Sequence, residues 1–233
     1  MEEAQLAENI ENVQRKIARA ADQAGRAPED ITLIAVSKTM PLELVQQAYR
    51  LGLKDFGENK VQDALPKIAA SQPEDLNWHM IGHLQSNKAS KVVGSFACIH
   101  SLDSLHLANV LNRHAQEHGK QQAVLLQINV SGEESKEGMT LEEAPELARQ
   151  ILTLPYLEIQ GLMTIAPRVE NPEEVRPVFR RLRLLRDRLR DQLPQASWQH
   201  LSMGMTDDYL VAITEGATMV RIGRAIFGER TYK

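Results

Sequence analysis

The chain has 233 residues, of which 42% are apolar, and this length and composition allow one buried core and argue against extensive disorder. Lys and Arg number 27 against 31 Asp and Glu, and the net charge of −4 argues against a globally basic nucleic-acid binder. The single cysteine excludes an intramolecular disulfide, and there is neither a secretory signal pattern nor an apolar run of roughly 20 residues. We expect one domain spanning residues 1–233, in the cytoplasm and without membrane contact.

The N-terminal segment has the pattern of an amphipathic helix. Leu6, Ile10, Val13 and Ile17 recur at helical spacing, and Gly25 ends the pattern. An additional helix is therefore predicted ahead of the first strand.

Strand and helix patterns alternate along the rest of the chain. Residues 31–36 form an almost wholly apolar, β-branched run, which is typical of a parallel strand buried on both faces. The predicted strands are residues 31–36, 53–57, 78–82, 96–101, 123–130, 157–163, 198–202 and 217–222. The predicted helices are residues 41–51, 58–70, 86–94, 104–118, a helix that begins at the capping-box pair Thr140 and Glu143, 173–193 and 206–215.

This alternation predicts an α/β protein with a closed (β/α)8 barrel, the TIM barrel, and an open doubly wound sheet is the alternative. The short tail after Ile222 leaves little room for an eighth full helix. We expect the N-terminal helix to cover that side of the barrel.

Lys38 stands out at the end of the first strand. In a barrel of this kind the chemistry lies at the carboxyl ends of the strands, and Lys38 ends the apolar run ITLIAVSK. A partly desolvated lysine has a lowered pKa and can form a Schiff base with an aldehyde or ketone. Taken alone, Lys38 is more simply explained as a strand-end lysine that extends into solvent.

The loops after the seventh and eighth strands have features of a phosphate site. The segment HLSMGMTDD offers the hydroxyl of Ser202 and, at Gly204, close approach of the backbone. The segment VRIGRAIFG places Gly223 and Arg224 ahead of a short helix, whose free N–H groups attract anions. Each loop alone is equally well explained as an ordinary helix cap. Together they indicate a phosphate facing an aldehyde-accepting lysine, hence pyridoxal 5′-phosphate (PLP), with a sugar-phosphate aldolase as the competing interpretation.

From about residue 31 to residue 228 the chain resembles the PLP-binding family sometimes called PLP homeostasis proteins. The motifs that carry the resemblance are LIAVSKT, FGEN, WHMIGHLQSNK, LQINVS, GLMTI, LSMGMTDD and GATMVRIGRAIFG. The family's barrel is similar to the N-terminal domain of alanine racemases and of eukaryotic-type ornithine decarboxylases, which are PLP enzymes of fold type III. Two positions depart from the family's pattern, Met80 for the more frequent Phe and Thr206 for Ser, and neither removes a ligand.

The resemblance implies that Lys38 carries PLP as a Schiff base. Arg221 would face the pyridine nitrogen, and Ser202 with the main-chain N–H groups of Gly223 and Arg224 would hold the phosphate. The implied cofactor-binding residues are Lys38, Asn59, His79, Ser202, Met203, Gly204, Arg221, Gly223 and Arg224. The simpler explanations are a salt bridge at the barrel rim for Arg221 and a hydrogen-bonded core residue for His79. No catalytic residue is predicted.

Arg221 also bears on activity. A guanidinium group stays protonated and can only donate, so a pyridine nitrogen that faces it accepts and remains unprotonated. Such a ring is a weaker electron sink, which disfavours broad amino-acid chemistry. Alanine racemases react with the same arrangement because a second domain supplies a tyrosine across a dimer interface, whereas here we expect the barrel to use the whole chain. None of the four tyrosines lies in a matching motif; they are Tyr49, Tyr156, Tyr209 and Tyr232.

The predicted function is therefore to hold PLP without substantial turnover, in vitamin B6 homeostasis and amino-acid balance. A small PLP-dependent racemase or decarboxylase is one alternative, and a regulatory module acting through a protein partner is the other. The expected partners are PLP and either PLP-dependent apoenzymes or a regulatory protein, with no nucleic acid, and the protein is expected to be a monomer.

Two further patterns have simpler explanations. His79 and His83 have a metal-like spacing only on a helix, and a strand followed by a turn does not place them on one face, so no metal is predicted. The arginine-rich stretch at residues 176–193 is the only candidate nucleic-acid or partner surface. Its apolar residues follow helical spacing and place the arginines mainly on the outer face, which favours a solvated barrel helix.

Overall fold

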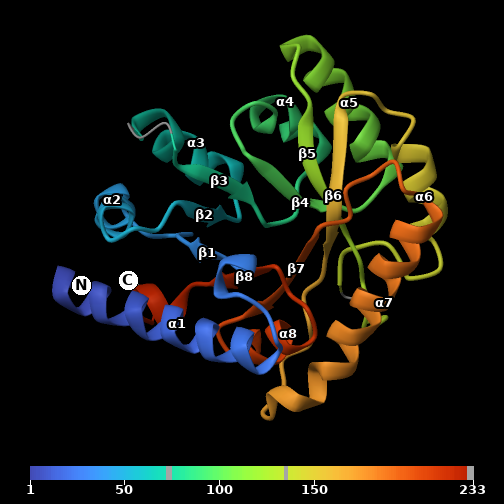
Figure 1. The fold of residues 1–233 in the computed structure, drawn as a ribbon. Helices are drawn as coiled ribbons and strands as arrows, with labels where there is room; N and C mark the ends of the chain where they lie inside the picture. The colour runs from blue at the N-terminus through green and yellow to red at the C-terminus, as the bar shows by residue number, and fades with distance from the viewer. Residues whose placement is uncertain (72–74, 134–135, 230–233) are drawn as a thin grey trace.

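Eight parallel strands close into a barrel in the computed structural model, which describes residues 1–71, 75–133 and 136–229 (Figure 1). The strands are β1 Thr32–Val36, β2 Asp55–Glu58, β3 Asn77–Met80, β4 Cys98–Leu102, β5 Gln122–Gln127, β6 Leu157–Met163, β7 His200–Met205 and β8 Met219–Ile222. β1 pairs with both β2 and β8, which closes the ring. The predicted closed barrel is confirmed, and the alternative of an open sheet is wrong.

Helices follow the strands as the local sequence signals predict. They are α1 Glu3–Gln23, α2 Leu42–Arg50, α3 Val61–Ala70, α4 Ala89–Val92, α5 Leu105–His118, α6 Ala144–Ile151, α7 Arg176–Gln192, α8 Tyr209–Thr214 and α9 Arg224–Phe227, with short 3-10 turns η1 Pro28–Asp30, η2 Ser86–Lys88 and η3 Pro172–Val175. The hydroxyl of Ser104 accepts the N–H of Leu107 at 3.3 Å and caps α5. Thr140 and Glu143 exchange the two predicted capping-box hydrogen bonds, at 3.0 and 3.1 Å, one turn ahead of α6.

The N-terminal helix α1 covers the side of the barrel where α9 is too short to do so. Its apolar stripe is buried from Leu6 to Ile17. It packs against α8 and α9, and the side-chain amide of Asn9 donates to the carbonyl of Ile226 at 2.9 Å (Figure 1). The predicted role of this helix is confirmed. Within the described ranges no helix, α1 included, is both long and apolar enough to cross a membrane.

The apolar core has two parts. The larger cluster lies between the barrel and its surrounding helices and includes Phe56, Trp78 and Phe179. The smaller cluster joins side chains from five strands of the closed ring and therefore fills the barrel interior; it consists of Ile34, Cys98, Leu125, Met163 and Met219.

The seventh strand is longer than the sequence predicts. It continues to Met205, so that Ser202, Met203 and Gly204 lie within β7 and are buried. Gly204 has a φ of +95°, and a Cβ atom there would lie 2.7 Å from the Cβ of Ala212 and 2.8 Å from the Cα of Tyr209. The predicted strand end at Ser202 is wrong. A glycine at position 204 suggests a loop, but here its lack of a side chain lets β7 pack closely against α8.

Candidate functional site

Lys38 lies in the turn after β1, two residues beyond the end of the strand, and its side chain is partly buried. β8 pairs with β1 so that Arg221 lies opposite Ile34. The residue after β8, Gly223, packs against the end of β1, because a Cβ atom on it would lie 3.5 Å from the Cβ of Val36. The end of β8 and the turn that carries Lys38 are therefore neighbours at the carboxyl end of the barrel.

A buried ion pair braces the segment before Lys38. Glu58, at the end of β2, is fully buried, and its Oε1 accepts from the hydroxyl of Ser37 and from Nζ of Lys67, both at 2.7 Å. Lys67, on α3, also donates to the carbonyl of Ser37 at 2.9 Å. The second carboxylate oxygen of Glu58 is buried and has no hydrogen-bond partner among the described residues. These contacts fix the backbone from which Lys38 extends, and the sequence analysis did not predict them.

Arg221 is a buried cation inside the barrel. Its side chain donates to the hydroxyl of Ser202 at 2.5 Å and to the carbonyl of Thr164 at 2.8 Å. Burial lowers the pKa of Arg221 to about 10, against a smaller raising effect of Asp208, so the guanidinium keeps its proton at neutral pH. The simpler explanation of Arg221 was a salt bridge at the barrel rim. These contacts do not fit it, because both partner oxygens are neutral.

Two histidines continue the polar contacts from Ser202 across the barrel. Nδ1 of His100, on β4, lies 2.9 Å from the hydroxyl of Ser202, and its Nε2 lies 3.0 Å from Nδ1 of His79, on β3. Nε2 of His79 lies 3.0 Å from Oδ1 of Asp55, at the start of β2. Burial lowers the pKa of His100 well below its ordinary value, and the nearby His79 and Arg221 add to this effect, so His100 is neutral. Neither His100 nor Asp55 was predicted from the sequence.

The loops after β7 and β8 are joined to each other. The side chain of Arg224 forms an ion pair with Asp207, and both side chains are exposed. Oδ1 of Asp208 accepts the N–H of Met205 at 2.6 Å, which fixes the turn between β7 and α8. Thr206 lies in this turn and is partly exposed. The two loops predicted to hold a phosphate therefore lie side by side.

The predicted residues lie in three different places. Asn59 directly follows β2 at the end of the barrel where Lys38 lies, and Gly82 lets the next loop approach it, since a Cβ atom there would lie 2.3 Å from the Asn59 carbonyl oxygen. Met203, by contrast, is fully buried in the outer apolar cluster. Lys38, Asn59, Arg224 and Gly223 thus share one end of the barrel, whereas His79 and Ser202 lie in its interior and Met203 faces away from it.

His79 and His83 do not come together. His79 is buried, and His83 lies in the loop after β3, where its Nδ1 is 3.5 Å from a carboxylate oxygen of Asp103 and 3.3 Å from one of Glu137. His83 thereby links the loops that follow β3, β4 and β5.

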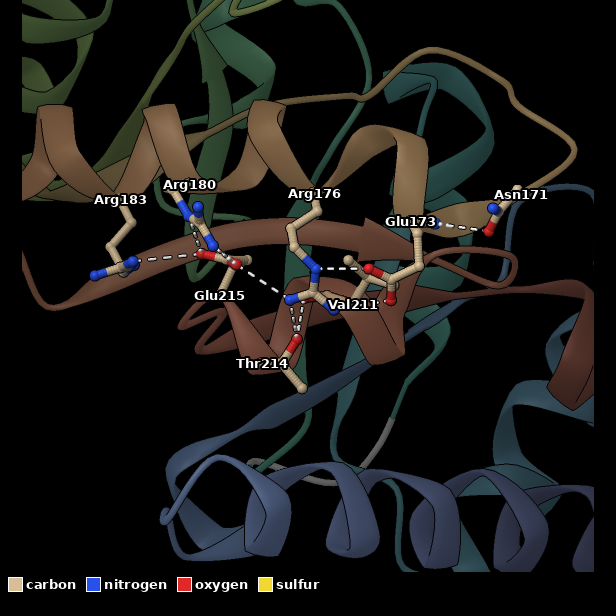
Figure 2. Close-up of polar contacts among 8 residues, drawn as sticks. All are labelled: Asn171, Glu173, Arg176, Arg180, Arg183, Val211, Thr214 and Glu215. Carbon is tan, nitrogen blue, oxygen red and sulfur yellow. Dashed lines mark hydrogen bonds and ion pairs between the residues drawn. The ribbon is translucent and has the colours of Figure 1, made fainter.

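The arginine-rich helix α7 packs against α8 through a buried carboxylate. Glu215, just after α8, accepts from Arg176 and Arg180 at 3.1 Å and from Arg183 at 3.3 Å (Figure 2). Arg176 also donates to the hydroxyl of Thr214 at 2.9 Å. These three arginines keep the predicted partial exposure to water, at 30%, 56% and 36% for Arg176, Arg180 and Arg183, and they also join α7 to α8, which the sequence did not indicate.

The chain is similar to proteins of one family over almost its whole length. The family model described as alanine racemase, N-terminal domain, matches residues 3–231. A protein of Aquifex aeolicus named pyridoxal phosphate homeostasis protein is 46% identical over 225 residues, which cover 97% of this chain and 98% of the relative. A protein of Escherichia coli with the same name is 43% identical over 231 residues, which cover 97% of each chain.

Solved structures agree with this similarity. PipY of Synechococcus elongatus, solved with PLP bound, is 39% identical to this chain. The match covers 91% of this chain and 100% of PipY, with a TM-score of 0.80. An unknown protein from Bifidobacterium adolescentis is 36% identical and reaches a TM-score of 0.88 over 97% of this chain and 95% of its own. Alanine racemase of Clostridium difficile, at 16% identity, has a TM-score of 0.76 over 99% of this chain and 58% of its own length, a likeness of fold alone.

Proposed function

Because the chain belongs to the alanine racemase N-terminal domain family, and within it to the pyridoxal phosphate homeostasis proteins, we propose that it holds PLP on Lys38 without substantial turnover of amino acids. The function is PLP homeostasis, and the cofactor is PLP.

The observation that carries the proposal is a buried, protonated guanidinium next to the strand that leads to Lys38. Arg221 is 4% exposed, and the hydroxyl and carbonyl to which it donates are neutral. A buried cation is stabilised by a partner that accepts hydrogen bonds, and the ring nitrogen of PLP is such an acceptor. The donor set suits the whole cofactor, with an amine for its aldehyde, a cation for its ring nitrogen and N–H groups at the start of α9 for its phosphate.

The contacts of Ser37 with Glu58 and Lys67 orient the backbone that carries Lys38. PLP supplies an aldehyde to which an amine attaches and a ring that withdraws electrons. Ser37 is bonded to Glu58 and, through Lys67, to α3 on the outside of the barrel. Because Ser37 is held toward the outside of the barrel, we expect the side chain of the next residue, Lys38, to turn inward. These contacts therefore present the amine to the barrel mouth.

At the phosphate end the structure favours a hydroxyl other than the predicted one. Ser202 is fully buried, with its hydroxyl in contact with Arg221 and His100. Thr206 is the next hydroxyl along the chain and is partly exposed beside the loop that contains Gly223. We assign phosphate contact to Thr206 and the N–H groups of Gly223 and Arg224, and we assign Ser202 to the support of Arg221.

The same guanidinium argues against turnover. Arg221 keeps its proton, and a nitrogen that accepts from it stays unprotonated, which weakens electron withdrawal by the ring. A small racemase or decarboxylase would also need an acid–base group beside Lys38. His100, in the barrel interior, is neutral and bonded to Ser202 and His79. The likeness to alanine racemase therefore extends to the barrel and not to its chemistry.

Transfer of PLP to apoenzymes, or action on a regulatory protein, is the expected biological use of such a site. The cytoplasmic location, the monomeric state, the lack of nucleic-acid binding and the single domain spanning residues 1–233 stay predictions.

The direct test is the absorbance of the protein after incubation with PLP. We expect a visible band that disappears on borohydride reduction, and we expect Lys38→Ala to lack it. Lys91→Ala, which removes an exposed lysine on α4, is the matched control and should keep the band.

The same samples test for turnover. Amino acids incubated in deuterated water with the PLP-loaded protein should exchange their α-protons no faster than with free PLP. A protein that takes up no PLP would contradict the function, and exchange that depends on Lys38 would favour the racemase or decarboxylase alternative.

A further inference from the structure

A continuous line of polar side chains crosses the interior of the barrel below the proposed cofactor site. It runs from Arg221 on β8 through Ser202 on β7, His100 on β4 and His79 on β3 to Asp55 on β2. The separations are 2.5, 2.9, 3.0 and 3.0 Å, and the three middle residues are at most 4% exposed. The step from Ser202 to His100 crosses the barrel between strands that lie three places apart in the closed ring.

The chemistry of the groups gives this line one direction. A guanidinium can only donate, so the hydroxyl oxygen of Ser202 accepts from Arg221. Its own hydrogen is then available for Nδ1 of His100. Because His100 is neutral and its Nδ1 accepts, its single N–H is at Nε2, from which it donates to Nδ1 of His79. His79 then donates from Nε2 to the carboxylate of Asp55.

The opposite direction leaves the hydrogen of Ser202 without an acceptor. It requires His100 to donate from Nδ1 to Ser202, and His79 to carry protons on both ring nitrogens. The hydroxyl of Ser202 would then accept twice in a fully buried place, and among the described residues its contacts are Arg221 and His100. It would also make His79 a second buried cation, separated from Arg221 by only Ser202 and His100. Unmet hydrogen bonds and unpaired charges in a barrel interior destabilise the folded protein.

The line fixes one side of the Arg221 side chain. One N–H group is held by Ser202, and another by the carbonyl of Thr164, whose hydroxyl is itself bonded to the carbonyl of Ile128 at 2.7 Å. Among the described residues these are the two hydrogen bonds that the guanidinium donates, so its remaining N–H groups can serve a ligand. Asp55, whose side chain is 24% exposed, ends the line at the amino-terminal end of β2 and also accepts from Asn77 at 3.2 Å.

We propose that His100 and His79 are positioning residues, which together with Asp55 hold the hydroxyl of Ser202 as an acceptor and so aim Arg221 at the ring nitrogen of PLP. This inference deepens the proposed function and rests on it for the identity of the ligand. The two histidines do not touch the cofactor in this account. They act through Ser202.

The first test needs no cofactor. In protein labelled with ¹⁵N-histidine, the imidazole shifts of His79 and His100 should show a hydrogen on Nε2 of each ring and none on Nδ1 of His100. His106, an exposed histidine at the start of α5, serves as the surface reference for these shifts. A hydrogen on Nδ1 of His100 would overturn the direction of the line and with it the proposal.

The second test uses three histidine variants loaded with PLP. His100→Leu removes both contacts, and we expect it to bind PLP about tenfold more weakly and with a shifted visible absorbance maximum, the effect of one lost buried hydrogen bond. His100→Gln can accept from Ser202 and donate to His79, and it should stay within about threefold of wild type. His106→Leu is the matched control for the surface and should bind as wild type does. Circular dichroism establishes that each variant is folded.

The outcomes separate the inference from the proposed function. If wild type binds PLP and folded His100→Leu binds it equally well with an unchanged spectrum, the positioning role is wrong while the function holds. If His100→Leu does not fold, His100→Gln and the imidazole shifts decide, and failure of His100→Gln to retain wild-type binding would contradict the proposal. If wild type itself binds no PLP, the proposed function fails first, and the inference fails with it.

Discussion

Two buried charges of opposite sign, Glu215 and Arg221, are each 4% exposed, yet their surroundings differ completely. Glu215, between α7 and α8, accepts from three arginines (Figure 2). Arg221, inside the barrel, donates to a hydroxyl and a carbonyl. The charge of Glu215 is thus paired with three opposite charges, whereas the charge of Arg221 is hydrogen-bonded to neutral groups only.

The pKa values of the two groups follow these surroundings. Burial alone would raise the pKa of Glu215, but the hydrogen bonds from Arg180, Arg176 and Arg183 outweigh it, so that the pKa is lowered. Burial lowers the pKa of Arg221 to about 10 with only Asp208 opposing it. A charge whose partners stabilise it supports the fold, whereas a buried charge with neutral partners is typical of a binding site. We therefore assign Glu215 a role in the stability of the fold and Arg221 a role in binding the ligand.

The largest expected effect follows replacement of the charge inside the barrel. Arg221→Met should weaken PLP binding about 30-fold, because a charge-assisted hydrogen bond contributes about 2 kcal/mol. Its free energy of unfolding without PLP should stay within about 1 kcal/mol of wild type, since an apolar side chain of similar length replaces a buried charge. PLP titration and urea unfolding measure the two effects. Equal losses of stability in Arg221→Met and Glu215→Ala would remove the distinction between the two charges.

The second effect concerns the charge between the helices. Glu215→Ala should lower the free energy of unfolding by about 2 kcal/mol, because three guanidinium groups lose their shared partner while remaining partly exposed to water. Its affinity for PLP should not change. Glu173→Ala is the control, since Glu173 is an exposed partner of Arg176 and its loss should cost less than about 1 kcal/mol. An unchanged unfolding midpoint in Glu215→Ala would contradict the structural role.

The smallest effect is a pH dependence. The folded pKa of Glu215 lies below its ordinary value of 4.5, so the unfolded chain binds the proton first as the pH falls. The stabilisation is fully present above pH 4.5 and is lost as the pH falls through the lower, folded value. Exposed carboxylates such as Glu173 contribute in the same direction, so the difference between wild type and Glu215→Gln is the useful quantity. We expect the melting temperatures of wild type and Glu215→Gln, measured between about pH 6 and about pH 3, to converge as the pH falls. Parallel curves would exclude this contribution.

The same contrast separates what the sequence could predict from what it could not. Apolar runs predict buried strands because burial on both faces leaves a local pattern, and residues 157–163 match β6 at both ends. Lys38 and Arg221 were predicted because each lies near the end of a predicted strand and within a motif that resembles the family. The end of β7 was missed because the positive φ of Gly204 depends on contact with α8.

Contacts between distant elements left no local signal. His100 and Ser202 are separated by 102 residues, and Glu215 lies 32 residues or more from its three arginines. Helical spacing places the arginines on the outer side of α7, but it does not show that α8 presents a carboxylate there. A histidine in a strand expected to be buried was the only available hint of the polar line, since buried histidines need hydrogen-bond partners.

Lys38 is the residue on which the proposed function depends most. Borohydride reduction of the PLP-loaded protein, followed by proteolysis and peptide mass spectrometry, locates the attached cofactor directly. We predict a single modified peptide that contains Lys38. Modification at another lysine, or spread over several exposed lysines, would contradict the assignment of the site.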